Sequence, residues 1–349
     1  MKFLVIRFSS IGDIVLTTPV VRCLKTQVVT AEVHYLTRQS FAPIFAANPY
    51  IDKMHYLQDD LQQVIDQLKQ EDYDYVIDLH HNLRTLKVKS ALKKKTFSFN
   101  KLNIEKWLLT AFKWNILPDV HIVDRYMQTV QEFGVKNDEA GLDYFIPANE
   151  HVKEEDIPTS HLAGYIGLVI GGAHNTKKYP LYKWKELCTK LDHPVILLGG
   201  KEDAAWGNEI ASIDPIKIYN ACGKFKLNES ADLVRRAKLI VTNDTGLMHV
   251  AAAFKKPVIS LWGNTVPEFG MFPYYGNVAE ENLISSRQVS NSGNIEVVSD
   301  GGKYDIVEID ELSCRPCSKI GYKKCPLKHF KCMEKIAVET VMERITARL

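Results

Sequence analysis

The sequence predicts an α/β protein built from two Rossmann-like domains that face a central cleft. Apolar runs of strand length alternate with helical patterns through both halves of the 349-residue chain. Two of these runs end in polar turns that contain glycine and open a helix. Alternation of this kind produces open parallel sheets covered by helices, and such sheets bind ligands at the carboxyl ends of their strands.

The first half of the chain carries the pattern of one such sheet. Strands are predicted at Phe3–Phe8, Glu32–Leu36, Lys53–Leu57, Tyr75–Leu79 and Thr96–Phe99. Helical stretches such as Leu61–Gln70 lie between them. The segment Ile157-Pro158-Thr159-Ser160 has the composition of a linker. We therefore expect residues 1–158 to form an N-terminal domain.

The second half repeats the alternation without an internal sequence repeat. Strands are predicted at Tyr165–Ile170, Pro194–Leu198, Ile216–Tyr219, Leu239–Thr242 and Pro257–Trp262. Residues 280–312 are rich in Ser, Asn, Gly and Asp and are expected to form a surface excursion. Within it, Ile295–Val298 and Tyr304–Val307 could pair as a hairpin. The expected C-terminal domain spans residues 159–331, and residues 332–349 are expected to form a last helix.

The composition is that of a two-domain cytoplasmic protein. Hydrophobic residues make up 46% and charged residues 25% of the chain, enough for two ordinary cores. No apolar run approaches the roughly 20 residues that span a bilayer, and the first residues enter a strand without a signal-peptide pattern. Seven cysteines without an export signal are expected to be reduced thiols.

Positive charge gathers in one segment, although the formal net charge is only +2. We call this the basic segment, and its cations are Arg84, Lys87, Lys89, Lys93, Lys94, Lys95 and Lys101. It is consistent with a surface for an anionic acceptor or for the cytoplasmic membrane face, or with a merely solvated helix face. Nucleic acid is not an expected partner, because no binding motif accompanies the lysines and the pI is only about 8.0.

One polar turn has the features of an anion site. The predicted strand that ends at Thr242 breaks into Asp244-Thr245-Gly246 and then a helix, whose first N–H groups and dipole favour a phosphate. Asp244 and Thr245 could hydrogen-bond a ribose or phosphate, Gly246 permits close approach, and His249 lies one turn further along. The alternative is that Asp244 only caps the helix and His249 belongs to the core.

The other polar turn follows the first predicted strand. It reads Ser9-Ser10-Ile11-Gly12-Asp13 and precedes a helical pattern. An aspartate at a strand end can take a proton from a substrate, but it can equally cap the helix.

These two segments resemble the bacterial lipopolysaccharide heptosyltransferases, glycosyltransferase family 9. The likeness extends through Asn48–Asp52, Asp74–Leu79 and Thr176–Pro180 in the same order, and it covers nearly the whole chain. It implies the glycosyltransferase B fold, with the acceptor in the first domain and the donor nucleotide in the second. In that fold the helix at 332–349 packs back across the first domain.

The resemblance implies an inverting transfer of a sugar, most simply heptose from ADP-heptose, to a lipopolysaccharide core or related glycolipid. It implies no cofactor and no metal. Asp13 matches the family's catalytic base, with Ser9, Ser10 and Gly12 forming its acceptor-side loop. Membrane contact would then be peripheral, at the inner face of the cytoplasmic membrane.

On the donor side, the resemblance gives Lys177 a catalytic and phosphate-binding role. A compact ammonium suits a diphosphate leaving group, and Thr176 adds a hydroxyl. Glu202 matches the family's ribose- or base-contacting acid. From the residues alone, the adjacent Lys177 and Lys178 are more typical of a wet surface, and Glu202 of an early helix position.

Other functions stay open. A nucleotide-sugar epimerase shares the fold, and a non-catalytic subunit of glycan assembly would keep the cleft. Kinase and dehydrogenase functions are disfavoured, because the phosphate fingerprints G-x-x-x-x-G-K-[ST] and G-x-G-x-x-G are missing. The Asp72-Tyr73-Asp74 triplet precedes a strand and is interpreted as a polar turn.

The C-terminal cysteines form a separate pattern. Cys314, Cys317, Cys325 and Cys332 have the spacing C-x2-C-x7-C-x6-C, with His329 nearby, and we call residues 314–332 the Cys-rich segment. Four thiols can close a zinc site, but such sites usually show two short-spaced pairs of ligands, and only one is present.

Overall fold

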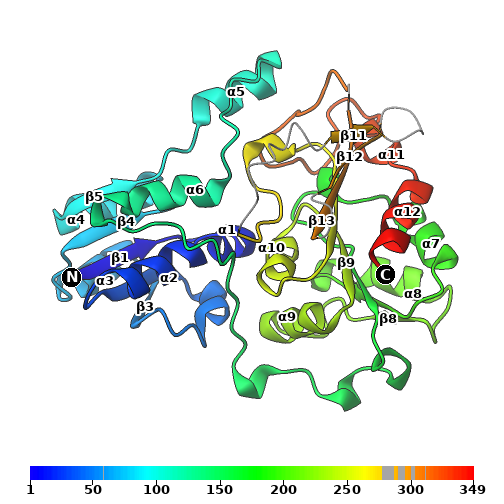
Figure 1. Cartoon of the computed structure of the whole chain (residues 1–349), viewed down its shortest axis with the longest axis horizontal. Helices are drawn as coiled ribbons and strands as arrows, with labels where there is room; N and C mark the ends of the chain where they lie inside the picture. Colours follow the sequence, from blue (N-terminus) through cyan, green and yellow to red (C-terminus); the bar gives the residue numbers. More distant parts are fainter. Residues whose placement is uncertain (58, 277–286, 290–294, 300–302, 311) are drawn as a thin grey trace. The chain divides into compact units, whose positions relative to one another are not determined.

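The computed structural model describes the chain except residues 58, 277–286, 290–294, 300–302 and 311 (Figure 1). It divides into two compact units: Met1–Leu102 with Val120–Pro147, and Asn103–Asp119 with Ala148–Leu349. The boundary therefore lies before the linker expected at residues 157–160, and a segment of the N-terminal half belongs to the second unit. No helix in the described residues is long and apolar enough to cross a bilayer.

The first unit is built on a parallel sheet with the order β3-β2-β1-β4-β5. Its strands are β1 (Lys2–Ile6), β2 (Glu32–Arg38), β3 (Lys53–Leu57), β4 (Tyr75–Asp78) and β5 (Lys95–Ser98). In register, Ile6 lies opposite Leu36 on one side and Asp78 on the other. All strands predicted in this half are confirmed.

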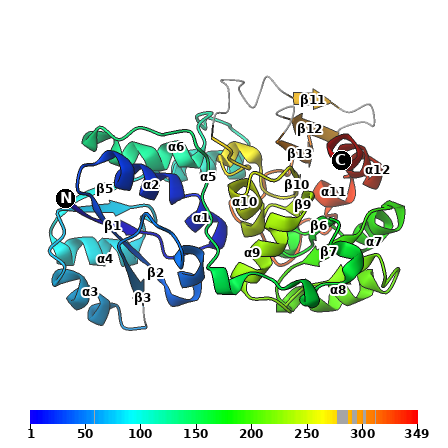
Figure 2. The same ribbon diagram turned by 60° about the horizontal axis from the view of Figure 1, so that its bottom comes forward.

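Helices cover both faces of this sheet, as Figure 2 shows for α2 and α6 on one face and α3 and α4 on the other. The helices are α1 (Ile11–Val15), α2 (Thr18–Gln27), α3 (Leu61–Lys69), α4 (Leu83–Leu92) and α6 (Ile122–Met127). In α3, Val64, Ile65 and Leu68 recur at helical spacing and bury against Leu4 and Ile6 of β1.

The second unit contains a longer, mixed sheet with the order β11-β12-β13-β10-β9-β6-β7-β8. Its strands are β6 (Ile166–Val169), β7 (Val195–Leu198), β8 (Ile218–Asn220), β9 (Leu239–Asn243), β10 (Val258–Trp262), β11 (Arg287–Val289), β12 (Ile295–Ser299) and β13 (Tyr304–Ile309). Strands β6 to β10 confirm the sequence prediction.

The expected surface excursion at 280–312 is only partly correct. Residues 280–286, 290–294, 300–302 and 311 lie outside the described residues. The predicted hairpin is confirmed, since β12 pairs with β13 in antiparallel register. However, every residue of β13 is buried, and β13 runs parallel to β10 inside the sheet. Asp305 and Glu308 interrupt its apolar pattern, and each is buried in an ion pair with an arginine.

The helices of the second unit enclose one large core. They are α7 (Leu181–Lys190), α8 (Ala204–Ala211), α9 (Leu227–Arg236), α10 (Gly246–Ala253), α11 (Lys331–Glu334) and α12 (Val338–Arg348). The predicted last helix is thus two helices. Val338, Val341 and Ile345 of α12 join the core of the second unit, and the packing of this helix on the first domain stays a prediction. Arg348 also pairs with Asp305 of β13 at 2.8 Å.

Helix α5 (Asn103–Phe112) and the chain after it belong to this second unit. Leu109 and Leu117 pack with Val266 and Phe269 in a small apolar cluster. Lys113 Nζ donates to the Pro316 carbonyl oxygen at 2.7 Å. These contacts attach a segment from the first half of the sequence to the Cys-rich segment near its end.

Candidate active site

Asp13 lies at the third position of α1, seven residues after β1 ends at Ile6. Its Oδ2 accepts hydrogen bonds from the Ser10 backbone N–H at 3.1 Å and the Ser10 hydroxyl at 2.7 Å. This is the geometry of a residue inside the first helical turn that reaches back to the cap, so Ser10 is the N-cap residue and Asp13 is not.

The other carboxylate oxygen of Asp13 is paired with a buried arginine. Arg7 Nη2 lies 2.6 Å from Asp13 Oδ1. The same guanidinium donates to the Ser9 and Leu79 carbonyl oxygens and to the Tyr126 hydroxyl. Burial acts to lower the pKa of Arg7, but the charge of Asp13 raises it above its ordinary value. Arg7 thus fixes the turn and balances its carboxylate.

The remaining residues of the acceptor-side loop differ in exposure. Gly12 is buried, Ser9 is half-buried, and Ser10 is exposed beside the half-buried Asp13. His80 contacts the same region, since its ring lies 5.1 Å from that of Phe8. Burial, and then the charge of Arg7, lower the pKa of His80 to about 4, so its ring is neutral at pH 7. Arg7 and His80 were not singled out from the sequence.

On the second unit, the structure brings together two predicted donor-site residues that are 67 positions apart. Lys177 Nζ lies 2.5 Å from Asp244 Oδ2, and both side chains are largely covered. The Thr265 hydroxyl donates to the same Asp244 oxygen at 2.8 Å. Lys177 is therefore not the freely solvated lysine that its neighbour Lys178 suggested.

A fully buried amide holds the loops around this pair together. Asn243 Nδ2 donates to the carbonyl oxygens of Val169, Ile170 and Gly171 at 3.0–3.3 Å. Its Oδ1 accepts from the Tyr179 N–H at 2.9 Å. The end of β9 is thereby joined to the loop that carries Lys177. Asn243 directly precedes the Asp244-Thr245-Gly246 turn, but its hydrogen-bond partners are too distant in sequence to be inferred.

Residues of the Cys-rich segment form hydrogen bonds with the same loops. The Thr176 hydroxyl donates to the Tyr322 carbonyl oxygen and accepts from the Tyr322 N–H, at 3.1 and 2.8 Å. Arg315 donates to the carbonyl oxygens of Gly263 and Thr265 at 2.6 and 2.9 Å. Thr176 is buried, and these bonds fix the residue next to Lys177, while a contact of Thr176 with the donor stays a prediction.

Lys178 and Glu202 both lie at the turn that follows β7. Lys178 Nζ lies 2.6 Å from Asp203 Oδ1, and Asp203 is buried. Asp203 Oδ2 accepts from the Gly200 N–H, which fixes the turn after β7. Glu202 on this turn is exposed and therefore accessible to a ligand.

Helix α10 begins beside Asp244, with Thr245 as its N-cap residue. The Thr245 hydroxyl lies 3.3 Å from that of Thr242, and within the described chain the side chain makes no capping hydrogen bond. The first N–H groups of the helix thus remain to be satisfied by a ligand or by water. His249, the fourth residue of the helix, is buried.

Asn264 is a further buried residue for which the sequence predicts no role. It is 2% exposed, and neither its Nδ2 nor its Oδ1 has a hydrogen-bond partner in the described chain. A buried amide without partners costs about 1–3 kcal/mol, which a ligand with a donor and an acceptor would recover. Its neighbour Thr265 already contacts Asp244.

In the described residues, the Cys-rich segment supplies no three ligand atoms that all lie within 4.8 Å of one another. All seven cysteines are free, and Cys314 Sγ lies 3.8 Å from His329 Nε2. Among the described residues, ligand atoms close enough to share a metal belong instead to His34, His55 and Glu71. Burial raises the pKa of the Cys332 thiol to about 12.

The basic segment is partly neutralised. Lys89 pairs with the buried Asp78 at 2.8 Å, Lys94 pairs with Asp72, and Lys95 pairs with Glu132. Arg84, Lys87 and Lys93 are exposed. The local excess of positive charge is therefore smaller than the sequence count suggests.

Comparison with known proteins agrees with both the sequence pattern and the fold. A lipopolysaccharide heptosyltransferase 1 from Campylobacter coli is 24% identical over 81% of this chain and 88% of its own. A lipooligosaccharide heptosyltransferase 2 from Haemophilus influenzae is 38% identical over 27% of this chain and 29% of its own. The solved structure of E. coli ADP-heptose lps heptosyltransferase II covers 100% of this chain and 98% of its own, with a TM-score of 0.70 and 20% identity. The model of glycosyltransferase family 9 (heptosyltransferase) matches residues 61–295, more than half of the chain, and the protein is therefore a glycosyltransferase that belongs to this family.

Proposed function

We propose that this protein transfers a heptose from ADP-heptose to the core of a lipopolysaccharide acceptor. Family membership supports transfer over epimerisation of a free sugar nucleotide, and relatives along most of the chain are lipopolysaccharide heptosyltransferases. The observation that carries the proposal is the Lys177–Asp244 pair beside the start of α10, because this arrangement suits a nucleoside diphosphate.

Different residues of the donor site contact different parts of the nucleotide. Lys177 and the first N–H groups of α10 supply positive potential for the diphosphate, both in the bound donor and as negative charge develops on the leaving group. Asp244 then exchanges its contact with Lys177 for one with a ribose hydroxyl. Asn264 and the exposed Glu202 add hydrogen bonds to the base or ribose.

Asp13 acts as the general base. Arg7 and Ser10 hold its carboxylate in one orientation, and the side chain is half-buried, so that an acceptor hydroxyl can reach it. The deprotonated hydroxyl attacks the anomeric carbon as the bond to the diphosphate breaks. Because no covalent sugar–enzyme intermediate forms, the configuration inverts.

The experiment measures ADP release from ADP-heptose with and without a truncated lipopolysaccharide acceptor. We expect Asp13→Ala to lower kcat by about 10²–10⁴-fold while the affinity for ADP stays unchanged. Asp66→Ala, which removes an exposed carboxylate of α3, is the control and should behave as wild type. Full activity of Asp13→Ala would exclude it as the base, and conversion of ADP-heptose without acceptor would favour an epimerase.

We also propose that the protein contacts the cytoplasmic membrane face peripherally. Ile104, Trp107, Phe112, Trp114 and Ile116, on and after α5, are 50–70% exposed. The three aromatic rings pack on one another, with centroids 5.2 Å apart for Trp107 and Phe112 and 5.6 Å for Phe112 and Trp114. Aromatic side chains of this kind partition into the headgroup region of a bilayer.

Vesicle sedimentation tests this contact. The double variant Trp107→Ser/Trp114→Ser should lose most of its binding to vesicles of phosphatidylglycerol and phosphatidylethanolamine. Ile216→Ser removes an apolar side chain that is 80% exposed on another part of the same unit, and should bind as wild type does. Equal binding by all proteins would exclude α5 as the contact.

A further inference from the structure

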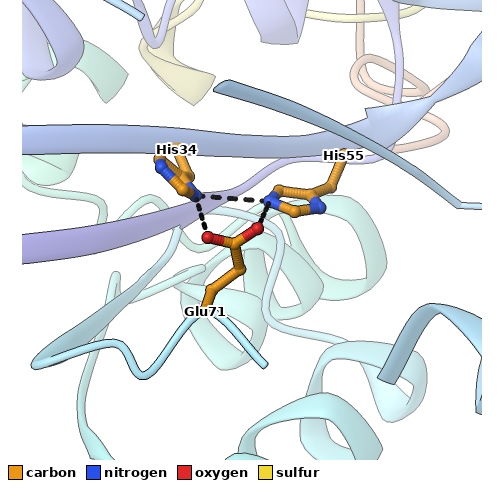
Figure 3. Close-up of side chains that lie close together, drawn as sticks. All are labelled: His34, His55 and Glu71. Atoms are coloured by element: carbon orange, nitrogen blue, oxygen red, sulfur yellow. Dashed lines mark hydrogen bonds and ion pairs between the residues drawn. The ribbon is translucent and has the colours of Figure 1, made fainter. Parts of the chain in front are cut away.

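A cluster of two histidines and a glutamate lies in the first unit, and none of its members has a role in the proposed transfer. His34 comes from β2, His55 from β3, and Glu71 from the loop between α3 and β4. His55 pairs in register with Leu36, two residues beyond His34, so both rings leave the same face of the sheet. Figure 3 shows the two carboxylate oxygens of Glu71 facing the two rings.

The distances between the facing atoms match those between ligands of one small metal ion. His34 Nδ1 lies 3.3 Å from His55 Nε2, and each of these atoms lies 3.8 Å from one oxygen of Glu71. Ligands about 2.0–2.1 Å from a tetrahedral zinc ion are about 3.3 Å from one another. The three ligand atoms all lie within 4.8 Å of each other.

The position of the ring hydrogen on His34 favours the binding of a cation. His34 Nε2 lies 2.8 Å from Glu32 Oε1, and a carboxylate can only accept, so this nitrogen carries the hydrogen. In the neutral ring Nδ1 then presents its lone pair to the cluster. A histidine oriented by a carboxylate on its far nitrogen is the usual outer-shell arrangement of zinc ligands.

The surroundings of the cluster are compatible with a divalent ion. His34 and His55 are buried, and the Tyr73 hydroxyl lies 3.0 Å from the facing nitrogen of each. Lys2 and Lys53 both contact Glu71 and would compete with a metal. Lys53 is half-exposed and can turn to solvent, while Lys2 retains Glu32 at 3.1 Å.

We propose that His34, His55 and Glu71 form a zinc site, with a fourth position for the Tyr73 oxygen or a water molecule. Imidazole nitrogens select zinc over magnesium or calcium, which prefer oxygen ligands. Because β3 is the edge strand of its sheet, the ion fastens this edge to β2 and to the α3–β4 loop. Its role is structural, separate from the groups that carry transfer.

The first test uses the wild-type full chain, stripped with chelator and then loaded with one equivalent of zinc. X-ray absorption should show only nitrogen and oxygen ligands at about 2.0–2.1 Å. A sulfur shell at about 2.3 Å would place the ion in the Cys-rich segment and overturn the proposal. Failure to retain zinc at micromolar concentration would overturn it as well.

Variants give an independent readout by zinc titration. His55→Asn and Glu71→Gln should weaken zinc binding at least tenfold, and Glu32→Gln, which leaves the ligands in place, should weaken it about tenfold or more. His329→Asn beside Cys314 is the control and should bind zinc as wild type does. A loss confined to His329→Asn would contradict the proposal. Since the absorption measurement needs no variant, a poorly folded variant does not affect the outcome.

Discussion

Arg22 on α2 holds a distant loop of the first unit through two aspartates. Its Nε and Nη2 donate to the two oxygens of Asp138, each at 2.7 Å. The same guanidinium pairs with Asp143 and donates to the Gly141 carbonyl oxygen at 2.8 Å. This bidentate geometry is stronger than an ordinary surface ion pair, and the hydrogen bonds from Arg22 lower the pKa of Asp138 below its ordinary value.

We predict that Asp138→Asn lowers the free energy of unfolding by about 1–2 kcal/mol near neutral pH. A carboxyl with a lowered pKa in the folded state stabilises fully above its unfolded pKa, about 4, and loses this contribution as the pH falls through the lower folded value. The difference between wild type and variant should therefore shrink below about pH 4. Denaturant unfolding followed by circular dichroism at several pH values measures it.

Asp66→Asn is a suitable control, since Asp66 is exposed and its contact with Lys69 is 3.4 Å long. It should change stability by less than about 0.5 kcal/mol at every pH. A constant difference for Asp138→Asn down to pH 3 would contradict the assigned cause.

At the residue scale, the sequence indicates which residues can carry the chemistry better than it indicates which residues they contact. The strand-then-helix pattern marked the segments of Asp13, Lys177 and Asp244, and the structure joins the last two in one ion pair. Arg7, Asn243 and Arg315 stayed undetected because their roles depend on carbonyl oxygens far away in sequence. The assigned roles of Asp13, Glu202 and His249 remain predictions.

The loop after β10 and the loop that carries Lys177 touch at a glycine. A Cβ on Gly263 would lie 2.6 Å from the Thr176 carbonyl oxygen and 3.0 Å from the Met333 side chain. Because the closer atom is backbone, one loop must move to admit even a methyl group. Gly172, in the preceding part of the Lys177 loop, would meet nothing nearer than 3.4 Å.

We therefore predict that Gly263→Ala weakens ADP binding by about tenfold or more and destabilises the second unit by about 1–3 kcal/mol. Gly172→Ala is the matched control and should leave the free energy of unfolding within about 0.5 kcal/mol of wild type. Calorimetric titration with ADP and chemical unfolding provide the two readouts. Wild-type affinity in Gly263→Ala would mean that the two loops are not coupled.

At the scale of elements, strands were predictable because each is a short apolar run with a clear end. Strand β3 was predicted at the residues where it occurs, Lys53–Leu57. Strand β13 was missed as a core element because Asp305 and Glu308 break its apolar pattern. The direction in which α12 packs depends on the surface available to it, which no local pattern specifies.

The two units of the whole molecule can be followed separately. All five tryptophans, at positions 107, 114, 184, 206 and 262, belong to the second unit. Intrinsic tryptophan fluorescence therefore reports unfolding of that unit, whereas amide exchange in β1 and β4 reports the first.

We predict that Leu109→Ala lowers the stability seen by fluorescence by about 2–3 kcal/mol, because Leu109 is buried against Val266 and Phe269. Amide exchange in β1 and β4 should not change. Leu327→Ala truncates a leucine that is 60% exposed in the same unit, and should have little effect on either readout. A loss confined to the first unit would show that α5 belongs there instead.

The discontinuity of the second unit also has a consequence for the order of synthesis. Residues 103–119 leave the ribosome well before Val266 and Phe269 exist, so Leu109 and Leu117 must wait without their partners while the chain grows. The first unit has all its residues once Pro147 has been made, and its sheet can form around this waiting segment. The second unit completes its core only with Ile345 of α12, four residues from the last residue of the sequence, Leu349. The first unit can therefore fold while the core of the second unit still lacks α12.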